Sequence, residues 1–92
     1  MEEIFLELQS AIKSKLVKKI TFDILEDDFV NLTVYDILGR KIAVLINDHL
    51  RAGTHSVIFD SQNLSREISS GIYFYKLSSN GSSKTKKMIL SK

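Results

Sequence analysis

Apolar and polar residues alternate along most of this chain, and a two-residue period is the pattern of a strand with one buried face. Ile20, Phe22 and Ile24 lie on one face of an early example, and Leu32 and Val34 on one face of the next. Polar or glycine-containing segments separate these runs. The pattern predicts strands over residues 20–24, 30–35, 41–46, 54–60, 71–77 and 84–90. The chain is therefore expected to be mainly β.

The segment Asn31–Arg40 predicts a hairpin between the second and third of these strands. The short carboxylate of Asp36 can accept a hydrogen bond from a backbone N–H two residues on. Gly39 can take the positive φ that closes a loop of three to five residues. Residues 42–46 of the returning strand are almost continuously apolar, which predicts cover on both faces. Residues 47–49 are expected to form the turn that follows.

Residues 71–77 give the strongest strand signal, because they are rich in β-branched and aromatic residues. Tyr73, Tyr75 and Leu77 share one face. We assign this face to the core because Lys76, on the other face, should stay in water, and the buried hydroxyls then require partners. Residues 78–83 predict a flexible loop centred on Asn-Gly. In the closing strand, Met88 and Leu90 are expected to face inward.

Residues 1–19 differ in pattern from the rest of the chain. Apolar residues recur at three- and four-residue intervals, and glutamates come early while lysines come late, which is favourable for a helix dipole. The pattern predicts a short N-terminal amphipathic helix over 1–19, followed by a β domain over 20–92. A strand over Glu3–Gln9 is the alternative, because Ile4, Leu6 and Leu8 also alternate. The apolar stripe is expected to cover the sandwich, with self-association through the helix as a second possibility.

Composition limits what the chain can do. Ninety-two residues make one domain, and a net charge of +2 is too balanced to favour a nucleic-acid partner. The chain has no cysteine, so it can form neither a disulfide nor a thiolate metal site. Its first residues, Met1-Glu2-Glu3, are acidic where a signal peptide is basic, and no apolar run has membrane-spanning length.

No catalytic or metal-binding constellation is visible. His49 and His55 are the only imidazoles and show no paired spacing, and Glu26-Asp27-Asp28 lacks the alternating oxygen ligands of a calcium loop. No serine lies in a nucleophile elbow, and the glycines are too scattered for a phosphate loop. We therefore expect a protein that is not an enzyme and has no cofactor, metal or small-molecule substrate.

A basic cluster near the C-terminus, Lys84, Lys86, Lys87 and Lys92, permits two interpretations. Lysines on a terminal edge strand discourage pairing between sheets of different molecules, which is a common structural use. Alternatively, a receptor adds contacts along this edge, and the charges set register and association rate.

Four segments, in order and approximate spacing, resemble the C-terminal sorting domain of type IX (Por) secretion cargo. They are Val34–Arg40, Ala52–Asp60 with its Ala-Gly-Thr-His start, Ser70–Leu77 and Lys86–Leu90. The resemblance implies an immunoglobulin-like antiparallel β-sandwich of about six or seven strands. It also implies a non-catalytic role, in which the outer-membrane type IX translocon recognises the domain and a surface peptidase removes it. The chain would then be part of a longer secreted or cell-surface cargo that supplies the signal peptide.

The resemblance also assigns roles to individual residues. It implies that some residues act through the fold: Asp36, Gly39 and Arg40 in the hairpin, and Gly71, Tyr73 and Tyr75 in the core strand. It favours direct recognition by the translocon for the terminal group Lys86, Lys87, Met88, Leu90 and Lys92.

Two departures from the family pattern keep other functions open. The chain has no proline, whereas the family usually has a proline-rich segment before its first strand. Residues 65–69 make a longer link before the Ser70–Leu77 segment than the sorting family typically has. In this respect the chain is closer to the immunoglobulin-like domain of flagellar hook-capping proteins. A structural assembly module of that kind, or an orphaned fragment without a cargo, are the alternative hypotheses.

Overall fold

The computed structural model describes residues 5–10, 17–60, 68–79 and 81–90, and in these residues the chain forms β-strands and no helix. The strands are β1 (Phe5–Ser10), β2 (Val17–Ile24), β3 (Asp28–Asp36), β4 (Lys41–Leu50), β5 (Gly53–Asp60), β6 (Gly71–Ser79) and β7 (Ser82–Leu90). The prediction of a mainly β chain is confirmed.

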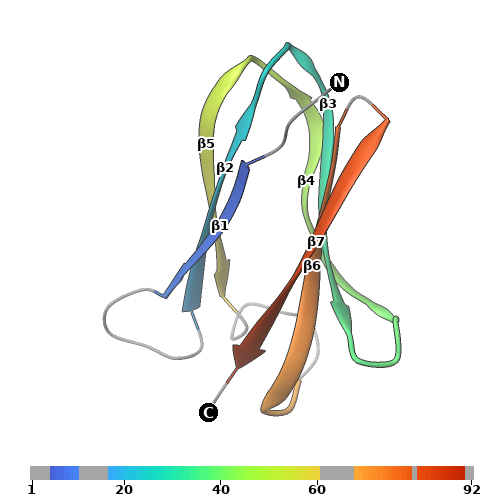
Figure 1. Cartoon of the computed structure of the whole chain (residues 1–92). Helices are drawn as coiled ribbons and strands as arrows, with labels where there is room; N and C mark the ends of the chain where they lie inside the picture. The colour runs from blue at the N-terminus through green and yellow to red at the C-terminus, as the bar shows by residue number, and fades with distance from the viewer. Residues whose placement is uncertain (1–4, 11–16, 61–67, 80, 91–92) are drawn as a thin grey trace.

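The strands form two antiparallel sheets that face one another (Figure 1). The smaller sheet has the order β1-β2-β5, and the larger sheet has the order β4-β3-β6-β7. β3 and β6 therefore lie at the centre of the larger sheet, and β4 and β7 are its two edges. Chain connections cross between the sheets after β2, β4 and β5, which makes a sandwich rather than a single curled sheet.

The core lies between the two sheets, and the alternation predicted from sequence decides which side chains enter it. Phe22 and Leu77 have no exposed surface, although they belong to different sheets. The buried apolar residues are Ile20, Phe22, Ile24, Val30, Leu32, Val34, Phe59, Ile68, Tyr73, Tyr75, Leu77, Met88 and Leu90. The inward faces assigned to residues 20–24, 30–34, 73–77 and 88–90 are confirmed.

The predicted N-terminal helix is wrong. Residues 5–10 form strand β1, in agreement with the alternative interpretation, and pair antiparallel with β2 so that Leu6 is opposite Phe22 and Leu8 opposite Ile20. β2 begins at Val17 and runs across the expected boundary between residues 19 and 20. Pairing with β2 provides backbone partners that periodicity alone cannot reveal, whereas an isolated helix of this length is marginal in water. Self-association through a helix accordingly loses its basis.

Strand β4 differs from the prediction in length and in burial. It continues through residues 47–49, which were expected to form a turn, and it is an edge strand in which Val44 is 47% exposed. The register against β3 shifts twice. Successive β3 residues pair first with Ile46 and Val44, which skips Leu45, and later with Ala43 and Lys41, which skips Ile42. Each shift inserts one extra residue in β4, as a β-bulge does, so neighbouring apolar residues can face the core together. The continuous apolar run therefore reflects bulges rather than cover on both faces.

The connection between β6 and β7 is shorter than predicted. Ser78 pairs with Ser83 and Ser79 with Ser82, so the ladder takes up most of the expected loop at residues 78–83. Only residues 80 and 81 connect the strands, and Gly81 has a φ of +75°, which is typical of tight hairpin turns. Leu64 and most of the link at 65–69 lie outside the described residues. Ile68, which follows them, is 9% exposed and packs with the core.

Candidate functional site

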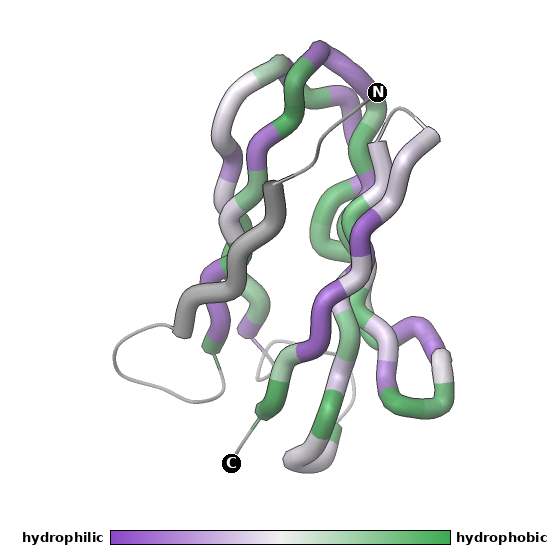
Figure 2. The backbone as a smooth tube through the Cα atoms, viewed as in Figure 1, coloured by the Kyte–Doolittle hydropathy of each residue, from purple (hydrophilic) through white to green (hydrophobic). Residues whose placement is uncertain are grey.

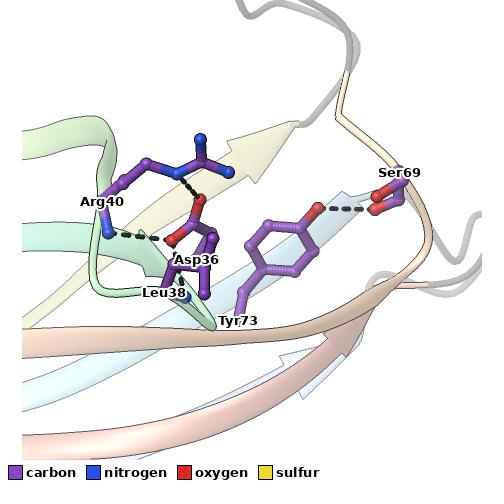
Figure 3. A network of polar contacts seen from close by, with 5 residues as sticks. All are labelled: Asp36, Leu38, Arg40, Ser69 and Tyr73. Carbon is purple, nitrogen blue, oxygen red and sulfur yellow. Dashed lines mark hydrogen bonds and ion pairs between the residues drawn. The ribbon is translucent and has the colours of Figure 1, made fainter.

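The hairpin between β3 and β4 is held by the carboxylate of Asp36 (Figure 3). Its Oδ1 accepts hydrogen bonds from the backbone N–H groups of Leu38 at 2.9 Å and Arg40 at 2.8 Å. Its Oδ2 accepts a bond from Arg40 Nε at 2.7 Å. The predicted bond to the N–H two residues on is confirmed, and Gly39 has a φ of +84°, as its role in the turn requires.

The electrostatics of Asp36 follow from these contacts. Partial burial acts to raise the pKa of the Asp36 carboxyl, but the bonds from Arg40 and Leu38 and the charge of Arg40 outweigh it, so the pKa lies below its ordinary value. Arg40 is largely exposed, and its ion pair with Asp36 spans the turn. The carboxylate therefore stabilises the folded hairpin more strongly when it is ionised than when it is protonated.

Replacing Asp36 with asparagine is expected to lower stability at neutral pH and to flatten the acid limb of the stability profile. A carboxyl with a lowered folded-state pKa contributes fully above its unfolded-state pKa, about 3.9, and loses that contribution as the pH falls through the folded-state value. The difference in free energy of unfolding between wild type and Asp36→Asn should therefore become smaller below about pH 4. Urea unfolding between pH 7 and pH 2.5 measures this. Glu26→Gln, at an exposed turn position, is the control, and a gap that is independent of pH would contradict the assignment.

Tyr73 ties the start of β6 to the preceding segment. Its hydroxyl donates a 2.6 Å hydrogen bond to the backbone carbonyl of Ser69, four residues earlier (Figure 3). The partner that burial required for this hydroxyl is thus present. A tyrosine that bonds back to upstream backbone at this point is typical of immunoglobulin-like sandwiches. Tyr75, 1% exposed, fills the centre of the core, and burial raises the pKa of its hydroxyl.

A pocket of about 280 Å³ lies between this hairpin and the start of β6. Ile37 and Leu38 at the hairpin tip are 66% and 74% exposed and line the pocket. Gly71, the first residue of β6, also lines it and pairs with Leu90 at the end of β7. Its charged groups, Asp36 and Arg40, already bond to each other. The pocket therefore offers mixed polar and apolar contact, and its carboxylate and guanidinium are already engaged with each other rather than available for acid–base chemistry.

The terminal strand β7 divides the predicted recognition residues into two groups. Lys86 and Lys87 are exposed, whereas Met88 and Leu90 are 1% and 2% exposed and belong to the core. Figure 2 shows the same division as a hydrophilic stretch that gives way to a hydrophobic end. Met88 and Leu90 can therefore fix the position of β7, but their side chains do not face outward. Lys92 lies outside the described residues.

The edge of β7 is open. β7 pairs with β6 from Gly71↔Leu90 to Ser79↔Ser82, and no described strand pairs with its other side. Exposed lysines at Lys84, Lys86 and Lys87 follow this edge. The prediction of a basic terminal edge strand is confirmed, and such an edge can accept an extended segment of another protein.

The other polar candidates have structural partners. His49 and His55 lie on different sheets: His49 contacts the ring of Phe29, and His55 stacks on Phe22 at 5.7 Å. Asp27 accepts a hydrogen bond from the backbone N–H of Ala52. Within the described ranges, no group of three histidine, cysteine or acidic side chains could hold a metal ion. The same part of the chain has no helix long and apolar enough to cross a membrane.

Sequence reasoning did not identify two features of the larger sheet. It gave no partner for Tyr73, because the Ser69 carbonyl is a backbone group that no residue type marks. It also did not weigh the outward residues of β6 together. Their signal was present in the alternation, since Ile72 and Phe74 oppose the buried tyrosine face.

Comparison with known proteins agrees with the geometry. The family model described as "Secretion system C-terminal sorting domain" matches residues 12–91, which include β2 to β7 entirely. Among curated proteins, none matches the chain. The matched family is not a catalytic one, and it implies a secreted or cell-surface cargo. The resemblance to hook-capping proteins gains no support from these findings. Since the match covers most of its length, the chain belongs to the secretion system C-terminal sorting domain family, and it carries the sorting signal of type IX secretion.

Proposed function

We propose that the outer-membrane type IX translocon recognises this domain through the open edge of β7. The observation that supports this proposal most strongly is the position of β7, which ends the chain's last ladder, has one unpaired side and carries exposed lysines. Edge strands offer a row of main-chain donors and acceptors to which an extended segment of a receptor can pair. The domain thereby acts as a folded label rather than as an enzyme.

The register of the β6–β7 hairpin assigns backbone groups to this edge. Ser79 and Ser82 flank a two-residue connection, and such flanking residues form a hydrogen-bonded pair. Bonded and non-bonded pairs alternate along the ladder, so every second residue of β7 bonds to β6 and the others point their N–H and C=O groups to the open side. The residues whose backbone N–H and C=O groups point to the open side are Ser83, Thr85, Lys87 and Ile89.

The predicted recognition residues then have different roles. Met88 and Leu90 anchor the strand in the core and hold the edge in place. Lys86 and Lys87 provide positive charges that favour association with an acidic receptor and set its register. Lys92, which lies outside the described residues, adds one more positive charge to this basic segment of the sequence. The second partner is a surface peptidase that releases the domain. The Tyr73–Ser69 contact favours an immunoglobulin-like fold, which holds β7 in a fixed position.

A reporter with a Sec signal peptide and residues 1–92 at its C-terminus tests the proposal in a bacterium that has the type IX machinery. The whole chain is used because a fusion beginning at residue 20 would remove β1 and divide β2. We expect the reporter at the surface or in the medium of this strain, and in the periplasm of a translocon-deficient strain. A folded reporter retained in the periplasm of both strains would exclude the sorting function and favour an assembly module.

A further inference from the structure

The larger sheet has an outer face, opposite the core, which we define by the outward residues of its four strands. Register places them there because they alternate with the residues that face the core, and all of them except Thr33, which is 2% exposed, are at least partly exposed. They are Phe29, Asn31, Thr33, Tyr35, Lys41, Val44, Asn47, His49, Ile72, Phe74, Lys76, Ser78, Ser83, Thr85, Lys87 and Ile89. An antiparallel sheet with one solvated face normally carries polar residues at such positions.

This outer face is unusually apolar near the ends of β6 and β7. Ile72 and Ile89 are cross-strand partners and are 37% and 59% exposed. One row across all four strands reads Lys87, Phe74, Tyr35 and Lys41 by register, so two aromatic residues lie between two lysines. Exposed apolar groups gathered in this way on a small domain mark an interaction surface.

The charge of the outer face has a single sign. None of its described positions is an aspartate or glutamate, whereas Lys76 and Lys87 are exposed there. The outer side of the smaller sheet differs, because Asp23 and Asp60 accompany Lys19 on β2 and β5. A second copy of the chain would bring lysines against lysines, which disfavours face-to-face self-association. An acidic partner surface would complement this face instead.

We propose that the outer face of the larger sheet is a second contact surface for the receptor, and that the receptor presents carboxylates around an apolar centre to it. This inference rests on the proposed function, since it concerns the same receptor. Lys87 and Ile89 belong both to the open edge and to the outer face, so a receptor segment paired along β7 lies beside these two side chains and one strand away from their partners Phe74 and Ile72. Edge pairing supplies main-chain bonds, and the outer face supplies selectivity for an acidic, apolar surface.

A charge series tests the acidic part of the inference in the full-length reporter. Lys76→Glu with Lys87→Glu is expected to slow export about tenfold, and the corresponding glutamine pair about threefold, because like charge repels where neutral residues only fail to attract. The matched control is Lys19→Glu with Arg51→Glu, two exposed positions outside both the open edge of β7 and the outer face, which changes net charge equally. Pulse-chase export rates give the comparison, and circular dichroism melts of the purified domains establish that each variant folds.

A pair of exposed isoleucines tests the apolar part independently. Ile89 on the outer face is 59% exposed, and Ile58 on the other sheet is 53% exposed. Ile89→Gln is expected to slow export several-fold, while Ile58→Gln should leave it unchanged, and both changes cost little stability because both side chains are exposed.

The outcomes separate this inference from the proposed function. If the wild-type reporter is exported and the outer-face variants match their controls, the second contact surface is excluded while the sorting function stands. Equal effects of the glutamine and glutamate pairs would exclude an acidic receptor surface. If the wild-type reporter itself depends on no translocon, both proposals fail.

Discussion

Export of the reporter is expected to fall about tenfold or more when Lys87 is replaced by proline, and to stay within about threefold of wild type when it is replaced by glutamine. Both changes remove the charge, but only proline removes the N–H that the β6–β7 register directs to the open side of β7. Proline is tolerated on edge strands at positions outside the ladder, so the fold should persist. Its ring would also obstruct an incoming strand.

The measurement is the rate at which reporter reaches the surface, with unfolding temperatures of the purified variants as a check on the fold. Lys86→Pro is the matched comparison, because the N–H of Lys86 bonds to β6 in this register, and its loss should lower stability as well as export. Equal export of the Lys87→Pro and Lys87→Gln variants would argue against main-chain pairing at this edge. Recognition would then depend on side chains alone.

Replacing Phe22 with alanine is expected to lower the free energy of unfolding by about 3–5 kcal/mol, as is typical for a buried aromatic residue replaced by alanine. Phe22 has no exposed surface and projects from β2 into the core between the sheets. A domain of this size has a total stability of roughly 5–15 kcal/mol, so the loss should leave a large fraction of molecules close to unfolding.

Urea denaturation measures the effect, and Phe29 provides a control of the same residue type. Phe29 is 44% exposed and contacts His49 at the surface, so Phe29→Ala should cost only about 1 kcal/mol. If export requires the folded sandwich, Phe22→Ala should abolish it, whereas Phe29→Ala, a change on the outer face, should keep the fold and lower export at most several-fold. Normal export of an unfolded Phe22→Ala variant would mean that the translocon reads an extended tail rather than a folded edge.

The parts of the fold that sequence predicted correctly depend on local signals. Alternation identified the inward faces of β2, β3, β6 and β7, because the order of apolar and polar residues within each strand shows which side chains are buried. The turn at Asp36 was also local, because its carboxylate bonds to residues two and four positions ahead. Such features need no knowledge of which strands become neighbours.

The errors arose where distant residues decide the outcome. β1 is a strand because β2 offers it an edge, and six residues are too few for periodicity to separate strand from helix. The apolar run in β4 resulted from bulges, which depend on register with β3. The recognition residues show a similar limit: alternation placed Met88 and Leu90 in the core, but a motif assignment also gave them receptor contact. The combined outer face became visible only once strand order was known.

The ladder between β6 and β7 has a mechanical consequence. β7 ends at Leu90 at one end of the sandwich, and β1 begins with Phe5 towards the other end (Figure 1). A pull between a cargo attached before β1 and a receptor bound to β7 therefore acts along the strands. In this shear geometry the nine residue pairs of the ladder share the load, whereas a perpendicular pull would open them one after another. If the proposed receptor binds β7 and a cargo precedes β1, this ladder would carry tension between them along its whole length before it opens.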